Sequence, residues 1–143
     1  MIPDAKIPVL QLSLNSKFAP ADHYEFAKVL APLRDENVLI IGSGNLVHNL
    51  GLLDFKNINT VGYLYDWAMD FNNFLKQKIQ HRDHNTLINY HSLGVEARKA
   101  IPTPEHYLPA LYILSLSDEK EEFRFFNDEG VGGSLTMTSF MYG

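Results

Sequence analysis

Two of the six histidines lie in loops whose neighbours set them apart. His48 follows a pair of glycines in "LIIGSGNLVHNL" (39–50), and His106 lies between prolines in "IPTPEHYLP" (101–109). A neutral imidazole can bind a divalent metal or exchange a proton, so both residues are candidates for chemistry. They lie far apart in the sequence, and a shared site would have to be assembled by the fold. The alternative is that each makes a structural hydrogen bond in its own loop.

The other histidines are weaker candidates for metal binding or proton transfer. His81 and His84 in "HRDHN" are three positions apart and could share a metal on one helix face, but the polar stretch is more typical of a solvated helix start. His23 is expected in the exposed first turn of a helix. His91 lies near a predicted helix end, where the macrodipole favours a cation. The acidic run 118–122 predicts a charged loop rather than a catalytic pair.

The glycine pair does not match a dinucleotide-binding fingerprint. That motif requires a third glycine three residues after the second, where Val47 stands. We therefore reject nucleotide binding and expect Gly42 and Gly44 to allow a sharp turn at the carboxyl end of a buried strand. Ligands of open α/β sheets gather beyond such strand ends, which is where this loop would place His48.

The elements that would position these loops begin with a strand–helix–strand unit. Residues 7–15 alternate as a strand does, and residues 37–44 are apolar on both faces, the pattern of a buried parallel strand. Between them, Asp22 and Glu25 suggest a capping box at a helix start, and Pro32 should kink or shorten that helix. The pattern predicts an α/β fold with a mainly parallel central sheet flanked by helices.

The second part of the chain is predicted to hold more helices and a strand-rich end. Because proline is tolerated in the first helical turn, the helix near Pro109 should begin there, with His106 just ahead of it. Apolar spacing and turn residues predict the following elements: helices over 67–79 and 85–90, a helix beginning near Pro109, and strands over 121–126 and 133–143 joined by the turn-rich "NDEGVGG".

Composition limits the possible functions. With 143 residues, 45% of them hydrophobic, the chain is expected to form a single domain over 1–143. The absence of cysteine excludes disulfides, thiolate nucleophiles and iron–sulfur clusters. A net charge of −5 with scattered basic residues argues against nucleic acid. Short apolar runs and an amino terminus without a basic leader argue against a membrane span or secretion, so we expect a cytoplasmic protein.

Several motifs together resemble a known family. "PDAKIPVLQLSLN", "GSGNLVHNL", "YDWAMDFNNFLK", "PTPEHYLPALYIL" and "GSLTMTSF" occur in the order found in class III extradiol ring-cleavage dioxygenases of the 4,5-DOPA extradiol dioxygenase type. The resemblance implies an α/β fold with a phosphorylase/hydrolase-like core and one divalent metal, iron(II) in the active enzymes, with zinc plausible. It further implies a catechol-type aromatic substrate and O2, with ring opening beside the diol.

The resemblance also implies roles for the two loop histidines. His48 matches the histidine of the family's "GN-V-HN" motif, and His106 matches that of "EHYLP". Both are therefore expected at the metal site, and His48 is also a candidate catalytic acid or base. His84 matches a family position that is not associated with the metal.

The sequence resembles only the carboxyl-terminal half of the family. The motifs "GHGSP" and "DHG" and a "SAHW"-like strand end, which supply further site histidines, are not in this sequence. We expect the chain alone to be inactive, because a catalytic iron of this kind needs three protein ligands. We also expect exposed strand edges that favour self-association or pairing with a separate amino-terminal half. The alternative is a non-catalytic α/β scaffold or a subunit that completes a metal site with another chain.

Overall fold

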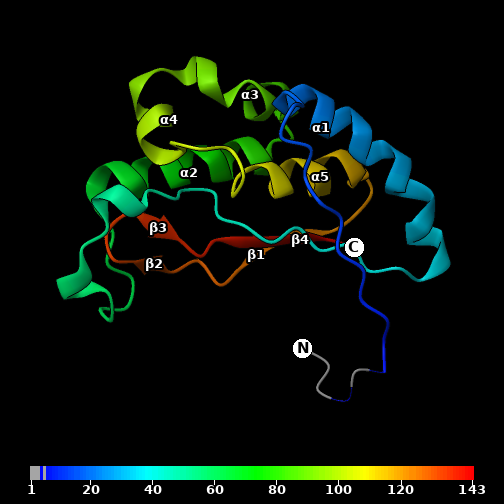
Figure 1. The fold of residues 1–143 in the computed structure, drawn as a ribbon, viewed down its shortest axis with the longest axis horizontal. Helices are drawn as coiled ribbons and strands as arrows, with labels where there is room; N and C mark the ends of the chain where they lie inside the picture. Colours follow the sequence, from blue (N-terminus) through cyan, green and yellow to red (C-terminus); the bar gives the residue numbers. More distant parts are fainter. Residues whose placement is uncertain (1–3, 5) are drawn as a thin grey trace.

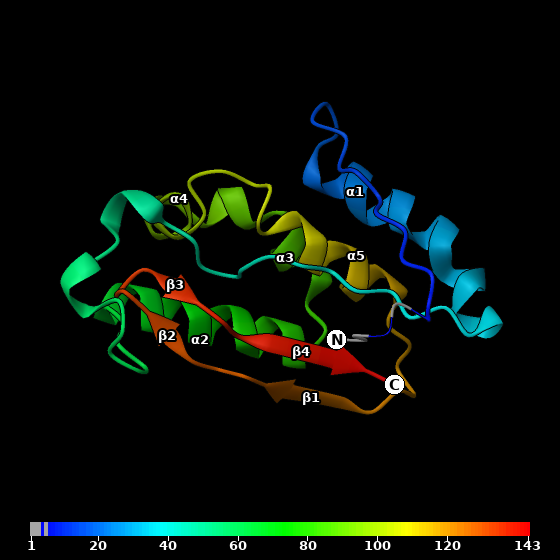
Figure 2. The same ribbon diagram turned by 60° about the horizontal axis from the view of Figure 1, so that its bottom comes forward.

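Helices pack as a layer against two small antiparallel β-sheets in the computed structural model, which describes residue 4 and residues 6–143 (Figures 1 and 2). None of the helices in this described part has the length and apolarity that crossing a bilayer requires. The elements, with η for 3-10 helices, are α1 (Pro20–Ala27), η1 (Lys28–Glu36), η2 (Leu50–Leu52), η3 (Phe55–Asn57), α2 (Asp66–Gln80), α3 (His84–Ile88), η4 (Tyr90–Leu93), α4 (Val95–Ala100), α5 (Leu108–Leu116), β1 (Phe123–Phe126), β2 (Gly130–Val131), β3 (Leu135–Thr136) and β4 (Ser139–Tyr142).

The core is built around α2 and α5. Helix α2 is amphipathic and buries Phe71, Leu75 and Ile79, as its apolar spacing predicts. Helix α5 is apolar around most of its surface, and Leu111 and Leu114 are buried in the same core. The predicted helices over 67–79 and from Pro109 are confirmed, and the one over 85–90 corresponds to the short α3. Helix α4 was not predicted.

Aromatic side chains attach the β1–β4 ribbon to this core. In the antiparallel register, Phe123 pairs with Tyr142 and Phe125 pairs with Phe140. All four rings lie against the core, while alternate residues such as Arg124 face outward. Cross-strand aromatic pairs of this kind contribute roughly 0.2–1 kcal/mol each. The strand-rich end of the chain is confirmed, although the predicted 133–143 strand is divided into β3 and β4 and the predicted turn 127–133 contains β2.

The expected parallel central sheet is not found among the described residues. Segments 7–15 and 37–44, both predicted as strands, pair with no strand in the described part of the chain, and Asn37 has the left-handed conformation. The two sheets that form there are antiparallel. A strand needs a hydrogen-bonded neighbour, and residues 4 and 6–143 offer none to either segment. As a result, side chains expected in a core face outward, with Leu10 96% and Leu39 82% exposed.

The first helix begins and ends differently from the prediction. Its N-cap is Ala19, whose N–H donates to the Asp22 carboxylate at 2.9 Å, so Asp22 lies inside the first turn rather than at the cap. The α-helix ends at Ala27, ahead of Pro32, and continues as the 3-10 helix η1. Proline has no N–H and clashes with an α-helical preceding turn, which explains this shortening.

His23 is buried, so the prediction that it is exposed is wrong. Its side chain lies on the face of α1 that packs against α5, it is 1% exposed, and its Nδ1 lies 2.9 Å from the Tyr112 hydroxyl. Burial lowers the pKa of His23 below its usual value, because the interior disfavours the charged imidazolium. The helix periodicity gave no sign of this partner.

His84 is also more enclosed than a solvated helix start would be. Its Nδ1 lies 2.7 Å from the Tyr24 hydroxyl, and its Nε2 is buried with no hydrogen-bond partner among the described residues. Burial lowers the pKa of His84 as well. Because α2 ends at Gln80 and α3 begins at His84, the exposed His81 is not on the same helix, which removes the shared helix face required for a metal pair.

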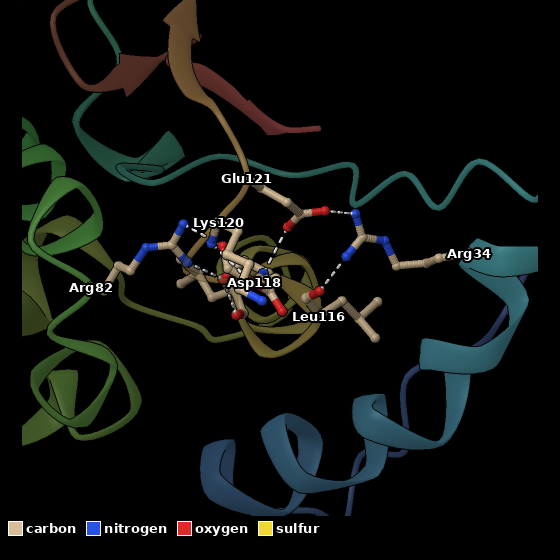
Figure 3. A network of polar contacts seen from close by, with 8 residues as sticks. Arg34, Arg82, Leu116, Asp118, Lys120 and Glu121 are labelled. Carbon is tan, nitrogen blue, oxygen red and sulfur yellow. Dashed lines mark hydrogen bonds and ion pairs between the residues drawn. The ribbon is translucent and has the colours of Figure 1, made fainter.

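Two arginines hold the carboxyl end of α5 from opposite sides (Figure 3). Arg34 donates to the Leu116 carbonyl at 2.5 Å and pairs with Glu121, and Arg82 donates to the Asp118 carbonyl at 2.6 Å. Cations are favourable at a helix carboxyl terminus, where unpaired carbonyls gather negative charge. The acidic run 118–122 is a charged loop, as predicted, and Glu121 fixes its position against η1.

The free energy of unfolding is expected to fall as the pH drops from about 7 to about 5. His23 and His84 have lowered pKa values in the folded chain, so the unfolded chain binds protons in this window that the folded chain does not. Stability is therefore complete above the unfolded pKa of about 6.5 and is lost as the pH falls below it. His23→Gln removes one such group and should flatten the dependence by up to about 1.4 kcal/mol per pH unit.

Urea unfolding at several pH values would measure these slopes. The exposed His91→Gln serves as the control and should leave the slope unchanged. Identical slopes for the unsubstituted chain and His23→Gln would contradict the assignment.

Candidate active site

His48 and His106 come together in the structure. Their imidazole rings are stacked, with centroids 3.8 Å apart and planes inclined by 10°, and both side chains are half-buried. The two loops singled out in the sequence therefore form one site. The remaining histidines that could be suspected of chemistry are placed elsewhere: His23 contacts Tyr112, and His84 contacts Tyr24.

Backbone hydrogen bonds hold His48 from two sides. On one side, His48 bridges to Leu135 as in an antiparallel ladder, and Thr136 donates its N–H to the Val47 carbonyl at 3.1 Å. On the other side, the N–H of His48 donates to the Ala100 carbonyl at 2.8 Å. The histidine thus lies between β3 and the end of α4, which limits the directions in which its ring can point.

His106 is fixed by the turn that starts α5. The next residue, Tyr107, is 1% exposed, and its hydroxyl donates to the Leu87 carbonyl at 2.9 Å. Leu108 donates its N–H to the Pro104 carbonyl, closing the turn around His106. As predicted, His106 lies just ahead of a helix whose first turn contains Pro109.

The two glycines of the loop allow a close backbone approach rather than a sharp turn. Neither Gly42 nor Gly44 has a positive φ, so the turn expected from the sequence is not the reason for them. A Cβ atom at Gly44 would lie 2.0 Å from the His106 carbonyl oxygen, and one at Gly42 would lie 2.6 Å from the Pro109 carbonyl oxygen. Only residues without a side chain let this segment pass directly over the start of α5.

Two asparagines on either side of His48 complete the attachment of the loop. Asn45 donates its side-chain N–H to the Thr136 carbonyl at 2.7 Å and its backbone N–H to the His106 carbonyl at 2.8 Å. Asn49 donates its side-chain N–H to the Lys99 carbonyl at 2.7 Å. Neither asparagine was predicted to contribute to the site. Their only signal in the sequence was their position beside His48 in the "GN-V-HN" motif.

The surroundings favour a neutral imidazole at His48. Burial lowers its pKa, and the electrostatic interaction with the neighbouring His106 ring lowers it further, while the carboxylate of Glu105 acts in the opposite direction. The pKa of Glu105 is itself lowered, first by the hydrogen bond from Thr103. A neutral imidazole is the form that can bind a metal or accept a proton. The lowered pKa of His48 is therefore compatible with either role.

The described residues do not form a complete metal site. No group of three or more histidine, aspartate or glutamate side chains converges anywhere in residue 4 or 6–143. The donor lone pairs of an imidazole lie in the plane of its ring, so two parallel rings do not point both lone pairs at one ion. Metal binding here would need a rotation of one ring and at least one further ligand.

Comparison with known proteins gives consistent matches. Residues 1–137 match a family described as the catalytic LigB subunit of aromatic ring-opening dioxygenase. The chain is 39% identical to a 4,5-DOPA dioxygenase extradiol of Escherichia coli K12, covering 100% of this chain and 52% of that protein. It is 29% identical to the protein of the same name from Beta vulgaris, again covering 52% of it.

A solved structure shares the fold. A crystal structure of an uncharacterized protein from Escherichia coli K12 superposes with a TM-score of 0.81 at 34% identity, covering 97% of this chain and 57% of that one. The chain therefore spans about half the length of the curated relatives it matches.

Gly44→Ala should destabilise the chain by about 1–3 kcal/mol, because the new Cβ collides with the His106 carbonyl, which is backbone and cannot move aside easily. Gly51→Ala is the matched control. Its Cβ meets only the Asn49 side chain at 3.3 Å, and its effect should stay within about 0.5 kcal/mol. Urea unfolding measures both, and equal losses for the two variants would show that the close approach does not matter.

Proposed function

Because this chain belongs to the family of catalytic LigB subunits of aromatic ring-opening dioxygenases, we propose that it supplies part of the active site of such an enzyme. The observation that supports this most directly is the stacked pair of His48 and His106. Two loops from distant parts of the sequence converge there, and specific backbone contacts hold both.

The proposed substrate is a catechol-type aromatic compound such as DOPA. Relatives from a bacterium and from plants carry the name 4,5-DOPA dioxygenase extradiol. In the proposed reaction, O2 cleaves the ring carbon–carbon bond beside the diol, and both oxygen atoms enter the product. The curated relatives are about twice as long as this chain, so the proposal concerns the assembled enzyme rather than this chain alone.

The proposed cofactor is one divalent metal, iron(II) or zinc. Imidazole nitrogens suit both ions, which is the chemical basis for proposing His48 and His106 as metal-site residues. Since the described residues offer no third ligand, we propose that further ligands come from a part of the enzyme that this chain does not contain. Two imidazoles alone would bind a metal weakly and would not fix its geometry.

His48 has two possible roles that experiment can separate. As a metal ligand it would need the neutral imidazole that its lowered pKa favours. As an acid or base, the same neutral ring would accept a proton from a catechol hydroxyl and later return it. The contacts of Asn45 and Asn49 hold the His48 loop in place for either role. We propose His106 as a ligand and His48 as a ligand or the proton acceptor.

A metal titration under anaerobic conditions tests the site. The chain alone should bind iron(II) or zinc weakly in the titration, and it should not open a catechol ring when O2 is then admitted. A chimera carrying, ahead of this chain, the part of the Escherichia coli relative that has no counterpart here should bind the metal at least about tenfold more tightly, because the ligand set is then complete.

Single substitutions in the chimera separate the roles. His106→Ala should abolish tight metal binding, and His91→Ala, at an exposed histidine outside the site, should not change it. Loss of metal in His48→Ala assigns a ligand, whereas retained metal with lost ring opening assigns the acid or base. Tight metal binding that survives both His48→Ala and His106→Ala would refute the proposed site. A chimera that binds the metal but opens no catechol ring would instead indicate a non-catalytic scaffold.

A further inference from the structure

The His48 loop (residues 42–49) has a methionine side chain beside it. Met137 directly follows β3, it is 40% exposed, and its Sδ lies 3.7 Å from the Nδ2 of Asn45. An exposed thioether can be oxidised to the sulfoxide, which turns a flexible apolar side chain into a polar, chiral one. Neither the metal site nor the proton transfer proposed above uses this sulfur.

Asn45 connects this methionine to the loops of both site histidines. Its side-chain amide donates to the Thr136 carbonyl at 2.7 Å, and the same nitrogen makes the longer contact with the sulfur of Met137. Its backbone N–H donates to the His106 carbonyl at 2.8 Å. A displacement of Asn45 would therefore reach the His48 loop and the turn that holds His106.

The backbone of Met137 is held in place, so an oxygen added to its sulfur has to be accommodated by side chains. The N–H of Met137 donates to the Glu129 carbonyl at 2.8 Å, and its carbonyl accepts from the Ser139 hydroxyl at 3.1 Å. A thioether sulfur is only a weak hydrogen-bond acceptor, whereas a sulfoxide oxygen is a strong one. The amide of Asn45 is a donor within reach of that oxygen.

We propose that Met137 is a site of reversible oxidation, whose sulfoxide oxygen draws the side-chain amide of Asn45 away from the Thr136 carbonyl and so loosens the His48 loop. Oxidation at this position would thereby disturb the stacked pair of His48 and His106 without touching either ring. The inference goes beyond the function proposed above and requires neither metal nor substrate.

The oxidant of the proposed step is hydrogen peroxide. A lone pair of the Met137 sulfur attacks one peroxide oxygen, so that the sulfur–oxygen bond forms as the oxygen–oxygen bond breaks. The other oxygen leaves as hydroxide and takes the proton of the transferred oxygen, which gives water. The sulfur is oxidised and the peroxide is reduced. Methionine sulfoxide reductases reverse the step with a dithiol, which becomes a disulfide while the oxygen leaves as water.

Two other methionines in the described part of the chain serve as internal comparisons. Met69 on α2 is 47% exposed, and Met141 on β4 is 38% exposed, with its sulfur accepting a hydrogen bond from Nε of Arg124 at 3.0 Å. The three residues are thus similarly open to peroxide, but among the described contacts only the sulfur of Met137 hydrogen-bonds to the His48 loop. Position rather than exposure therefore distinguishes Met137.

Peroxide treatment followed by amide hydrogen exchange tests the proposal. Peptide mass spectrometry gives the fraction of sulfoxide at each methionine. Once Met137 is oxidised, the backbone amide of Asn45 should exchange about threefold to tenfold faster, because the hydrogen bonds around it are weakened, while the amides of α2 should not change.

Three results would overturn the proposal. The first is unchanged exchange at Asn45 with Met137 fully oxidised. The second is protection lost throughout α2 as well, which would show that the whole chain unfolds rather than the loop alone. The third is a Met137 that stays reduced while Met69 and Met141 are oxidised.

Matched substitutions assign the effect to one sulfur. Leucine has a similar volume and has no sulfur to oxidise, so Met137→Leu should keep the exchange rates of the untreated chain and lose the response to peroxide. Met141→Leu is the control, because Met141 is almost as exposed but lies on β4, and it should keep the full response. Reductase treatment should restore slow exchange in this control. Equal responses of the two variants would overturn the assignment to Met137.

The imidazole signals report on the site directly. Because the rings of His48 and His106 are stacked with centroids 3.8 Å apart, a displacement of either loop should move the NMR signals of both rings when Met137 is oxidised. The signals of the exposed His91, outside the site, should stay in place. Unmoved signals of His48 and His106 would contradict the proposed link.

The chimera described above separates this inference from the proposed function. If oxidation of Met137 speeds exchange at Asn45 while the chimera neither binds metal tightly nor opens a catechol ring, the inference stands and the proposed function fails. If the chimera binds metal and opens the ring but exchange at Asn45 does not respond to oxidation, the proposed function stands and the inference fails.

Discussion

The close approach of two backbones at Gly44 and His106 is the constraint on which the rest of the site depends. Because Gly44 has no side chain, the loop passes directly over the turn that begins α5, and Asn45 can donate to the His106 carbonyl. The same loop then forms ladder contacts with β3, which tie it to the strand-rich end of the chain. The absence of a side chain at Gly44 therefore lets the His48 loop contact both the start of α5 and β3, and the imidazoles of His48 and His106 stack there.

The site brings two imidazole rings together but has no third metal-binding side chain among the described residues. Burial lowers the pKa of His48, which favours the neutral ring that a base or a ligand requires, and the backbone of His48 is hydrogen-bonded on both sides. Its ring nevertheless lies parallel to that of His106, and no third ligand converges within the described residues. These facts agree with the length of the relatives, which are about twice as long. A site formed between this chain and a further part of the polypeptide would leave this pair without its other ligands when the chain is isolated.

The strand-like segments of the chain differ in whether their backbone hydrogen bonds are satisfied by a neighbouring strand. Strands β1 and β4 satisfy their hydrogen bonds with each other, and Phe123, Phe125, Phe140 and Tyr142 pack against the core. Segments 7–14 and 39–41 have equally strand-like sequences but no hydrogen-bonded strand beside them among the described residues, and most of their aliphatic side chains are exposed. Burying a strand requires a partner ladder as well as an apolar face, and β1 and β4 have both.

The sequence by itself determined those elements that depend on interactions between residues close together in the chain. The apolar spacing of α2, the position of Pro109 in the first turn of α5 and the charged loop 118–122 were all predictable, because periodicity, proline geometry and charge act over a few residues. The motifs around His48 and His106 were likewise enough to indicate the family. The tertiary structure alone decided that His23 is buried against Tyr112, that Gly42 and Gly44 serve a close approach, and that the expected parallel sheet does not form. Each of these depends on contacts between residues distant in the sequence, or on neighbouring strands that are absent from the described residues, and no local pattern contains that information.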